Sequence, residues 1–144
     1  MTTEAASAVV LDTHALIWLM QGSDRIGARS RELIAAAAQA DSVFVAAISA
    51  WEIAMLVAKG RLALDRDVGE WLDTALSLHG LRLAALDPLV AVDSTRLPGE
   101  VHGDPADRLI VATARRRAAM LITDDKLILQ YGVAGHVRVH RAGA

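Results

Sequence analysis

Short apolar runs and helical segments alternate along the 144 residues of this chain, and this alternation constrains the fold more than any other feature. Strands that alternate with helices form parallel sheets covered by helices on both faces. We therefore expect a three-layer α/β/α fold with a central parallel sheet of four to five strands. The candidate strands are residues 8–11, 42–46, 81–85 and 119–123, with a further edge strand at 137–140.

Residues that favour helix starts mark the segments between these strands. Ser49 and Glu52 have the spacing of a capping box, as do Asp67 and Glu70. Asp104 precedes a proline, which suits the first turn of a helix. The predicted helices are residues 13–20, 28–40, 49–59, 67–79, 88–94, 104–117 and 127–131.

Composition is typical of a folded protein, and we expect residues 1–144 to form a single domain whose first seven residues are frayed. Hydrophobic residues make up 53% of the chain and mean hydropathy is +0.33, which indicates a well-buried interior. The net charge of −2 means that a polyanion would have to meet a local basic patch. The chain has no cysteine, leader-like segment or bilayer-spanning apolar stretch, so we expect a cytoplasmic protein outside the membrane.

Carboxylates recur where apolar strands lead into helices. Asp12 follows the first strand directly, and Glu52 follows the second. Asp125 follows the fourth strand, and Asp107 opens the helix before it. Because such strand ends lie along one edge of a parallel sheet, we expect the four acids to meet in one crevice. Two carboxylates about 4 Å apart repel by roughly 1–4 kcal/mol. Mg²⁺ or Mn²⁺ would remove this cost, and the pattern therefore predicts a metal site.

Each acid also has a structural explanation, because acidic residues at helix starts act as caps that contribute about 1 kcal/mol. Asp12 and Asp125 would cap the helices that follow them. Glu52 would complete the capping box of Ser49, and Asp107 would lie in a first helical turn. Taken singly, Glu52 and Asp107 favour capping, whereas the set of four acids favours a metal site. Capping alone is the preferred explanation for three further acids: Asp67, Glu70 and Asp87.

Four short motifs resemble those of PIN domains, and most closely those of the VapC toxins of bacterial toxin–antitoxin pairs. They cover nearly the whole chain in the expected order and spacing, and four motifs in register are more specific than any one alone. The motifs are Val10-Leu11-Asp12-Thr13-His14, Ser49-Ala50-Trp51-Glu52-Ile53, His102-Gly103-Asp104-Pro105-Ala106-Asp107-Arg108 and Leu121-Ile122-Thr123-Asp124-Asp125.

The resemblance implies a metal-dependent endoribonuclease whose catalytic and metal-binding acids are Asp12, Glu52, Asp107 and Asp125. Asp104 belongs to the third motif, either as a further ligand or as a helix cap. Asp12 would be the central ligand and Asp107 the next. Glu52 would bind directly or orient water, and Asp125 would complete an outer shell. The Mg²⁺ or Mn²⁺ ion would activate a water for attack on phosphorus, and a second ion, if bound, would stabilise the leaving oxygen.

Substrate contacts are predicted at residues near these acids. Arg108 and the run Arg115-Arg116-Arg117 are candidate phosphate contacts, although a basic run also suits the C-terminal end of a helix. Thr123 would hydrogen-bond a ligand or phosphate, or be structural. His14 and His102 would act as general acids or pack in the fold. Because aromatic residues make up only 3% of the chain, specificity should come mainly from RNA shape rather than base stacking.

The resemblance also implies several partners. The substrate would be a structured RNA such as tRNA or rRNA, cut to inhibit translation. A cognate antitoxin would insert a segment into the active-site groove, often with a basic side chain near the acids. We further expect a homodimer and a larger toxin–antitoxin hetero-oligomer. The helix around Trp51, Met55 and Leu56 is a candidate dimer interface, although core burial would also explain these residues.

Three other functions match parts of the pattern. A phosphatase of the haloacid-dehalogenase type begins with a strand-end Asp but needs Asp-x-Asp, and His14 occupies the second place here. A response-regulator receiver needs a phosphorylated Asp after the third strand, where Asp87 is badly spaced. A catalytically silent PIN-like module that only binds RNA or protein would not require all four acids. The complete acidic set favours the nuclease.

Overall fold

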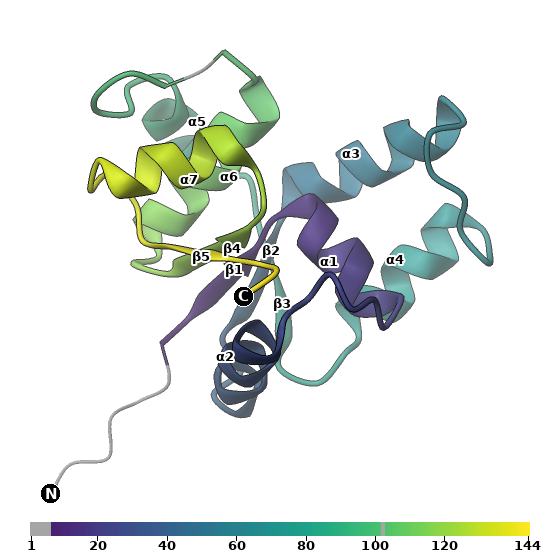
Figure 1. Ribbon diagram of the computed structural model, residues 1–144. Coiled ribbons are helices and arrows are strands. Elements are labelled where there is room, and N and C mark those ends of the chain that lie inside the picture. The colour runs from purple at the N-terminus through teal and green to yellow at the C-terminus, as the bar shows by residue number, and fades with distance from the viewer. Residues whose placement is uncertain (1–6, 102) are drawn as a thin grey trace, which may run out of the picture.

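A five-stranded sheet with the order β3-β2-β1-β4-β5 forms the centre of the computed structural model (Figure 1). The structure describes residues 7–101 and 103–144, so His102 and six of the seven residues expected to be frayed lie outside the described residues. All neighbouring strands pair in parallel. The strands are β1 (Val9–Leu11), β2 (Val43–Ala46), β3 (Leu81–Ala84), β4 (Met120–Thr123) and β5 (Val139–Arg141). The predicted edge strand is present as β5, shifted toward the C-terminus.

Helices cover both faces of this sheet. Helices α1 and α2 pack on one face together with α3 and α4, whereas α6 and α7 pack on the other, with α5 against α6. Their bounds are α1 (Thr13–Met20), α2 (Ala28–Gln39), α3 (Ala47–Ala58), α4 (Val68–Leu76), α5 (Pro88–Ser94), α6 (Pro105–Arg116) and α7 (Lys126–Val133). The predicted three-layer α/β/α architecture with a parallel sheet is therefore confirmed. Within the described residues, no helix has the length and apolar character needed to cross a membrane.

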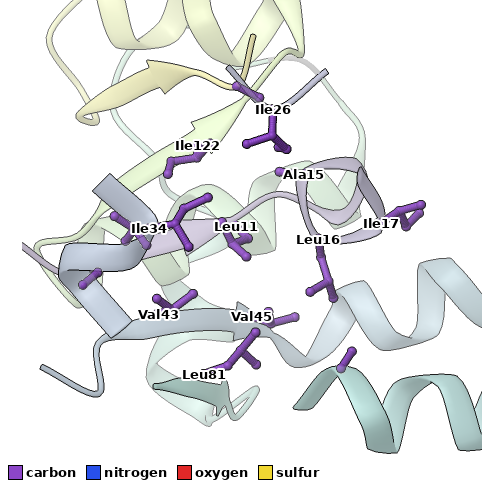
Figure 2. Close-up of a cluster of buried hydrophobic side chains, with 14 of the residues drawn as sticks. Leu11, Ala15, Leu16, Ile17, Ile26, Ile34, Val43, Val45, Leu81 and Ile122 are labelled. Atoms are coloured by element: carbon purple, nitrogen blue, oxygen red, sulfur yellow. The ribbon is translucent and has the colours of Figure 1, made fainter. Parts of the chain in front are cut away.

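Alternating side chains of the central strands fill the two cores. Leu11 joins the cluster that α1 and α2 cover, where Figure 2 shows it near Ile34 and Val45. Val10 points to the opposite face and joins the second cluster with Ile110 of α6. Full burial of such a side chain contributes roughly 1.5–3 kcal/mol, and a slip of one residue would reverse the faces. The register is therefore fixed, and with it the place where each strand ends.

The order of strands reverses between β1 and β4. The chain builds β1, β2 and β3 in one direction across the sheet and then places β4 and β5 on the other side of β1. Ligands of parallel α/β sheets bind outside the carboxyl ends of the strands at such a switch point. Asp12 follows β1 here, and Asp124 and Asp125 follow β4.

Helix α3 begins earlier than predicted, which makes the proposed capping box of Ser49 and Glu52 wrong. The helix starts at Ala47 directly after β2, and its N-cap, Ala46, makes no side-chain hydrogen bond. Ser49 is fully buried in the first turn, and Glu52 lies in the second. Tertiary packing decides this start, because β2 ends at the sheet edge and Ile53 is completely buried against the core.

The other predicted caps are present. Asp67 accepts hydrogen bonds from the backbone N–H groups of Gly69 and Glu70, and Asp87 accepts one from Val90. Structural capping therefore accounts for these two acids. Helix α7 continues to Val133, beyond the predicted end at Tyr131.

Gly80→Ala should destabilise the fold far more than Gly60→Ala. Both glycines have positive φ, of +78° and +69°, so alanine is strained at each by roughly 1–2 kcal/mol. At Gly80 the added methyl would also lie 2.3 Å from the Ala38 carbonyl oxygen, whereas nothing lies within 4 Å of it at Gly60. We expect urea unfolding to show an extra loss of about 1–3 kcal/mol at Gly80. Equal losses would contradict this packing argument.

Candidate active site

Six carboxylates surround one pocket at the carboxyl edge of the sheet. The pocket has a volume of about 320 Å³ and is also lined by Thr13, His14 and Trp18. The acids are Asp12, Glu52, Asp104, Asp107, Asp124 and Asp125. The four acids singled out in the sequence therefore lie around one cavity, although more than a hundred positions separate the first from the last.

Asp12 is held at the floor of this pocket by both of its oxygens. Its Oδ1 accepts a hydrogen bond from the backbone N–H of Thr13 at 2.8 Å, and Oδ2 accepts one from Thr123 Oγ1 at 2.6 Å. Its own N–H donates to the Ile122 carbonyl, so the backbone is fixed as well. Burial raises the pKa of Asp12, and these two hydrogen bonds oppose that rise.

Thr13 links the start of α1 to α3. Its hydroxyl donates to Glu52 Oε1 at 2.6 Å and lies 2.9 Å from Ser49 Oγ. Glu52 is thereby turned toward the pocket, while burial and the nearby charges of Asp12 and Asp104 raise its pKa. Thr13 was not predicted to be a functional residue, although its position next to Asp12 in the first motif was an available signal.

Asp104 and Asp125 are helix caps that also line the pocket. Asp104 Oδ1 accepts from the backbone N–H groups of Ala106 and Asp107, at the start of α6. Asp125 Oδ1 likewise accepts from the first turn of α7, at 2.9 and 3.0 Å. Both caps use a single carboxylate oxygen. The structural and functional explanations of these acids are therefore compatible.

The acidity of Asp107 is strongly perturbed. Partial burial, followed by repulsion from Asp104, Asp12, Asp125 and Glu52, raises the pKa of its carboxyl from 3.8 to about 7. A bound cation would relieve this repulsion.

Hard carboxylate oxygens crowded in this way fit Mg²⁺ or Mn²⁺ as ligands. No three Asp, Glu or His side chains in the described ranges converge closely enough to form a ready ligand set. By donor type and charge, the residues that would hold an ion are Asp12, Glu52, Asp107 and Asp125.

The arginines predicted to contact phosphate do not line this pocket. Arg108 points its guanidinium toward the Ser94 and Val101 carbonyls, on the α5 side of α6. Arg115 donates to the His136 carbonyl, and Arg116 lies 3.5 Å from an Asp93 oxygen. These last two stand near the far end of α6, about 12–14 Å along the helix axis from Asp107. The direction of α6, which the sequence does not give, leads them away from the acids.

Thr123 and His14 occupy different kinds of position. Thr123 is completely buried, donates to Asp12 and accepts from the Asp125 N–H, so it positions acids and does not face a substrate. His14 is exposed, lines the pocket and lies with its ring centroid 6.0 Å from that of Trp18. His102, the other predicted histidine, is outside the described residues.

Asp107→Asn should stabilise the metal-free protein above pH 7. Because the folded-state pKa lies above the ordinary value, wild-type stability falls as pH rises from about 4 to about 7. The asparagine variant lacks this loss, and we expect a gain of about 1 kcal/mol at pH 8, allowing for solvent screening. Urea unfolding in EDTA between pH 5 and 9 measures it. The exposed Asp73→Asn on α4 is the control, and a parallel pH response of Asp107→Asn and wild type would refute the prediction.

The chain is similar in sequence to known proteins. The PIN domain family profile matches residues 9–133 of the chain. Ribonuclease VapC22 of Mycobacterium tuberculosis is 37% identical over 120 residues, which cover 83% of this chain and 88% of that protein.

Solved structures share the fold at lower identity. VapBC2 from Rickettsia felis, bound to a DNA fragment from its promoter, matches with a TM-score of 0.68 and 16% identity over 93% of this chain and 98% of that chain. A toxin–antitoxin complex from Klebsiella pneumoniae matches with a TM-score of 0.61 and 22% identity over 94% of this chain and 98% of that chain. The family profile spans most of the sequence, and the identity to VapC22 extends over nearly that whole protein. The chain therefore belongs to the PIN domain family, within its VapC-type branch.

Proposed function

We propose that this chain is the endoribonuclease toxin of a toxin–antitoxin pair and that it hydrolyses phosphodiester bonds in structured RNA with Mg²⁺. The observation that carries the proposal is the pocket of six carboxylates, in which burial and then mutual repulsion raise the pKa of Asp107 to about 7. The similarity to a protein named as a ribonuclease supports RNA as the substrate. A toxin that blocks translation would act on tRNA or rRNA in the cytoplasm.

The side chains of the pocket have distinct roles in this mechanism. Mg²⁺, or Mn²⁺ in its place, would supply a water of lowered pKa and offset the negative charge of the phosphate. Asp12, fixed by Thr123 and the Thr13 amide, would provide carboxylate oxygens in a fixed position as ligands of the ion. Glu52, oriented by the Thr13 hydroxyl, would orient the attacking water or bind the ion. The exposed His14 is placed to give a proton to the leaving oxygen.

Asp12→Asn should abolish metal-dependent cleavage of RNA. Loss of this carboxylate removes one ligand charge, and we expect the rate to fall by at least about 100-fold. Purified protein is incubated with total RNA, with Mg²⁺ or with EDTA, and the products are resolved on a gel. Asp67→Asn, which alters the cap of α4 away from the pocket, should cleave as wild type does.

Two results would overturn the proposed function. Cleavage that persists in EDTA or in Asp12→Asn would show that the acids do not hold a required metal. Hydrolysis of phosphorylated small molecules without RNA cleavage would favour a phosphatase instead.

We further propose that an antitoxin binds a groove beside the acids and that the toxin forms homodimers. The groove has a volume of about 430 Å³ and contains Asp107 together with apolar Val111, Leu127 and Tyr131, so a peptide crossing it would reach the site. Structural neighbours that are toxin–antitoxin complexes support such a partner. For the homodimer, Trp51 is 55% exposed on α3, which favours an interface over core burial.

Substitutions at these two surfaces should separate the two kinds of assembly. Trp51→Glu should convert the toxin alone from dimer to monomer in analytical ultracentrifugation, because a buried charge opposes association. Leu127→Glu should leave the dimer intact but prevent a co-purifying protein from inhibiting RNA cleavage. If the wild-type toxin alone sediments as a monomer, the proposed homodimer is refuted. If the co-purifying protein still inhibits Leu127→Glu fully, the groove is not its binding site.

A further inference from the structure

The acidic pocket needs positive charge at its rim if it is to receive a phosphate backbone. Six carboxylates line it, and His14 is the one basic residue among its described lining residues. Arg108, Arg115 and Arg116 point elsewhere, toward carbonyls or Asp93. RNA binding depends on neutralising phosphates. Basic side chains from other elements must therefore stand at the rim of the pocket.

Helix α1 brings an aromatic ring to that rim, and the loop between α1 and α2 places an arginine beside the ring. Trp18 lines the pocket, and the Arg25 guanidinium carbon lies 5.3 Å from its ring centroid. Trp18 is half-buried and packs against the first core cluster, which holds its ring in position. The loop is itself held, because Ser23 donates to the Trp18 carbonyl and its own carbonyl accepts from Arg31.

The end of β5 adds a second arginine beside this loop. Gly27 donates to the Ala142 carbonyl, and Ser30 Oγ to that of Arg141, so the two segments are joined; Figure 1 shows the C-terminal end next to the chain that follows α1. Arg141 is exposed. Gly143 lies beside both Arg141 and Asp124. A Cβ atom at Gly143 would lie 3.3 Å from Arg141 Nη1 and 3.6 Å from Asp124 Oδ2. The Arg141 guanidinium therefore stands close to an acid that lines the pocket.

We propose that Trp18, Arg25 and Arg141 form a substrate strip that binds unpaired RNA next to the cleaved bond, an assignment that rests on the proposed ribonuclease function. Trp18 stacks one base, and the two arginines contact the adjoining phosphates. On binding, Arg25 moves from the Trp18 ring to the phosphate and leaves that face of the ring to the base. A single stacking position is compatible with a chain that has only 3% aromatic residues. The strip thus selects a loop or bulge over a continuous duplex.

Binding of defined oligonucleotides tests the strip. The probes are a fluorescein-labelled twelve-nucleotide oligo(A) and an abasic oligomer of the same length, with affinities measured by fluorescence anisotropy in EDTA across a range of salt concentrations. Trp18→Leu should weaken oligo(A) binding by at least about fivefold and remove the preference over the abasic oligomer, whereas Trp18→Phe should keep it. Arg25→Ala and Arg141→Ala should each reduce the salt slope by about one. Arg29→Ala, an exposed arginine paired with Glu32 on α2, should leave the slope unchanged.

Cleavage of total RNA by the same variants separates the strip from the nuclease itself. Each strip variant should raise KM with a smaller effect on kcat, because it retains the acids. If wild type cleaves RNA but these variants keep its affinity, salt slope and KM, the strip is refuted while the ribonuclease stands. If no protein cleaves RNA, the proposed function fails instead. Thermal unfolding checks that Trp18→Leu is folded, and the arginine variants test the proposal without altering the core.

Discussion

A buried carboxylate fixed at the switch point of a parallel sheet is the constraint on which the site depends. Asp12 is removed from water, which would be costly for an ionised group without compensating hydrogen bonds. One oxygen is bound by the first amide of α1 and the other by Thr123 at the end of β4. One partner follows β1 and the other ends the adjacent strand β4, so the side chain is fixed only when β1 and β4 are paired in register. The packing of the two cores thus determines the position of the acid.

Local patterns were sufficient to predict the sheet, its parallel pairing and the strand ends at which acids recur. They were insufficient where distant packing decides the outcome. Helix α3 begins at Ala47 because β2 ends there and Ile53 is buried. Its N-cap, Ala46, has no side chain that can cap a helix, so the sequence carries no local signal for this start. The hydrogen bond from Thr13 to Glu52 joins residues 39 positions apart, which spacing alone does not reveal. Arg115 and Arg116 follow Asp107 in the sequence, but the axis of α6 places them about 12–14 Å from it.

Helix caps and a metal site are not alternatives in this architecture. Asp12, Asp104 and Asp125 are the N-caps of α1, α6 and α7, so three helix N-termini meet around the same pocket. Their partial positive charges favour the ionised acids, each by about 0.3–1 kcal/mol where exposed. At Asp107 that help is outweighed by burial together with repulsion from the neighbouring carboxylates, because the pKa of this carboxyl is raised to about 7. The site therefore retains an excess of negative charge that a divalent ion would offset.

Inside the site, the acids accept hydrogen bonds from neutral hydroxyl groups, which leaves their excess negative charge in place. Thr13 and Thr123 donate to Glu52 and Asp12 without adding a full positive charge, and both threonines are buried. A lysine or arginine in either place would orient the acid but also neutralise it, which would weaken the attraction for a cation. The arginines near the pocket are exposed instead, on the loop after α1 and at the end of β5. There they can meet a phosphate without competing for the ligands, so the same molecule can attract both a metal ion and a polyanion.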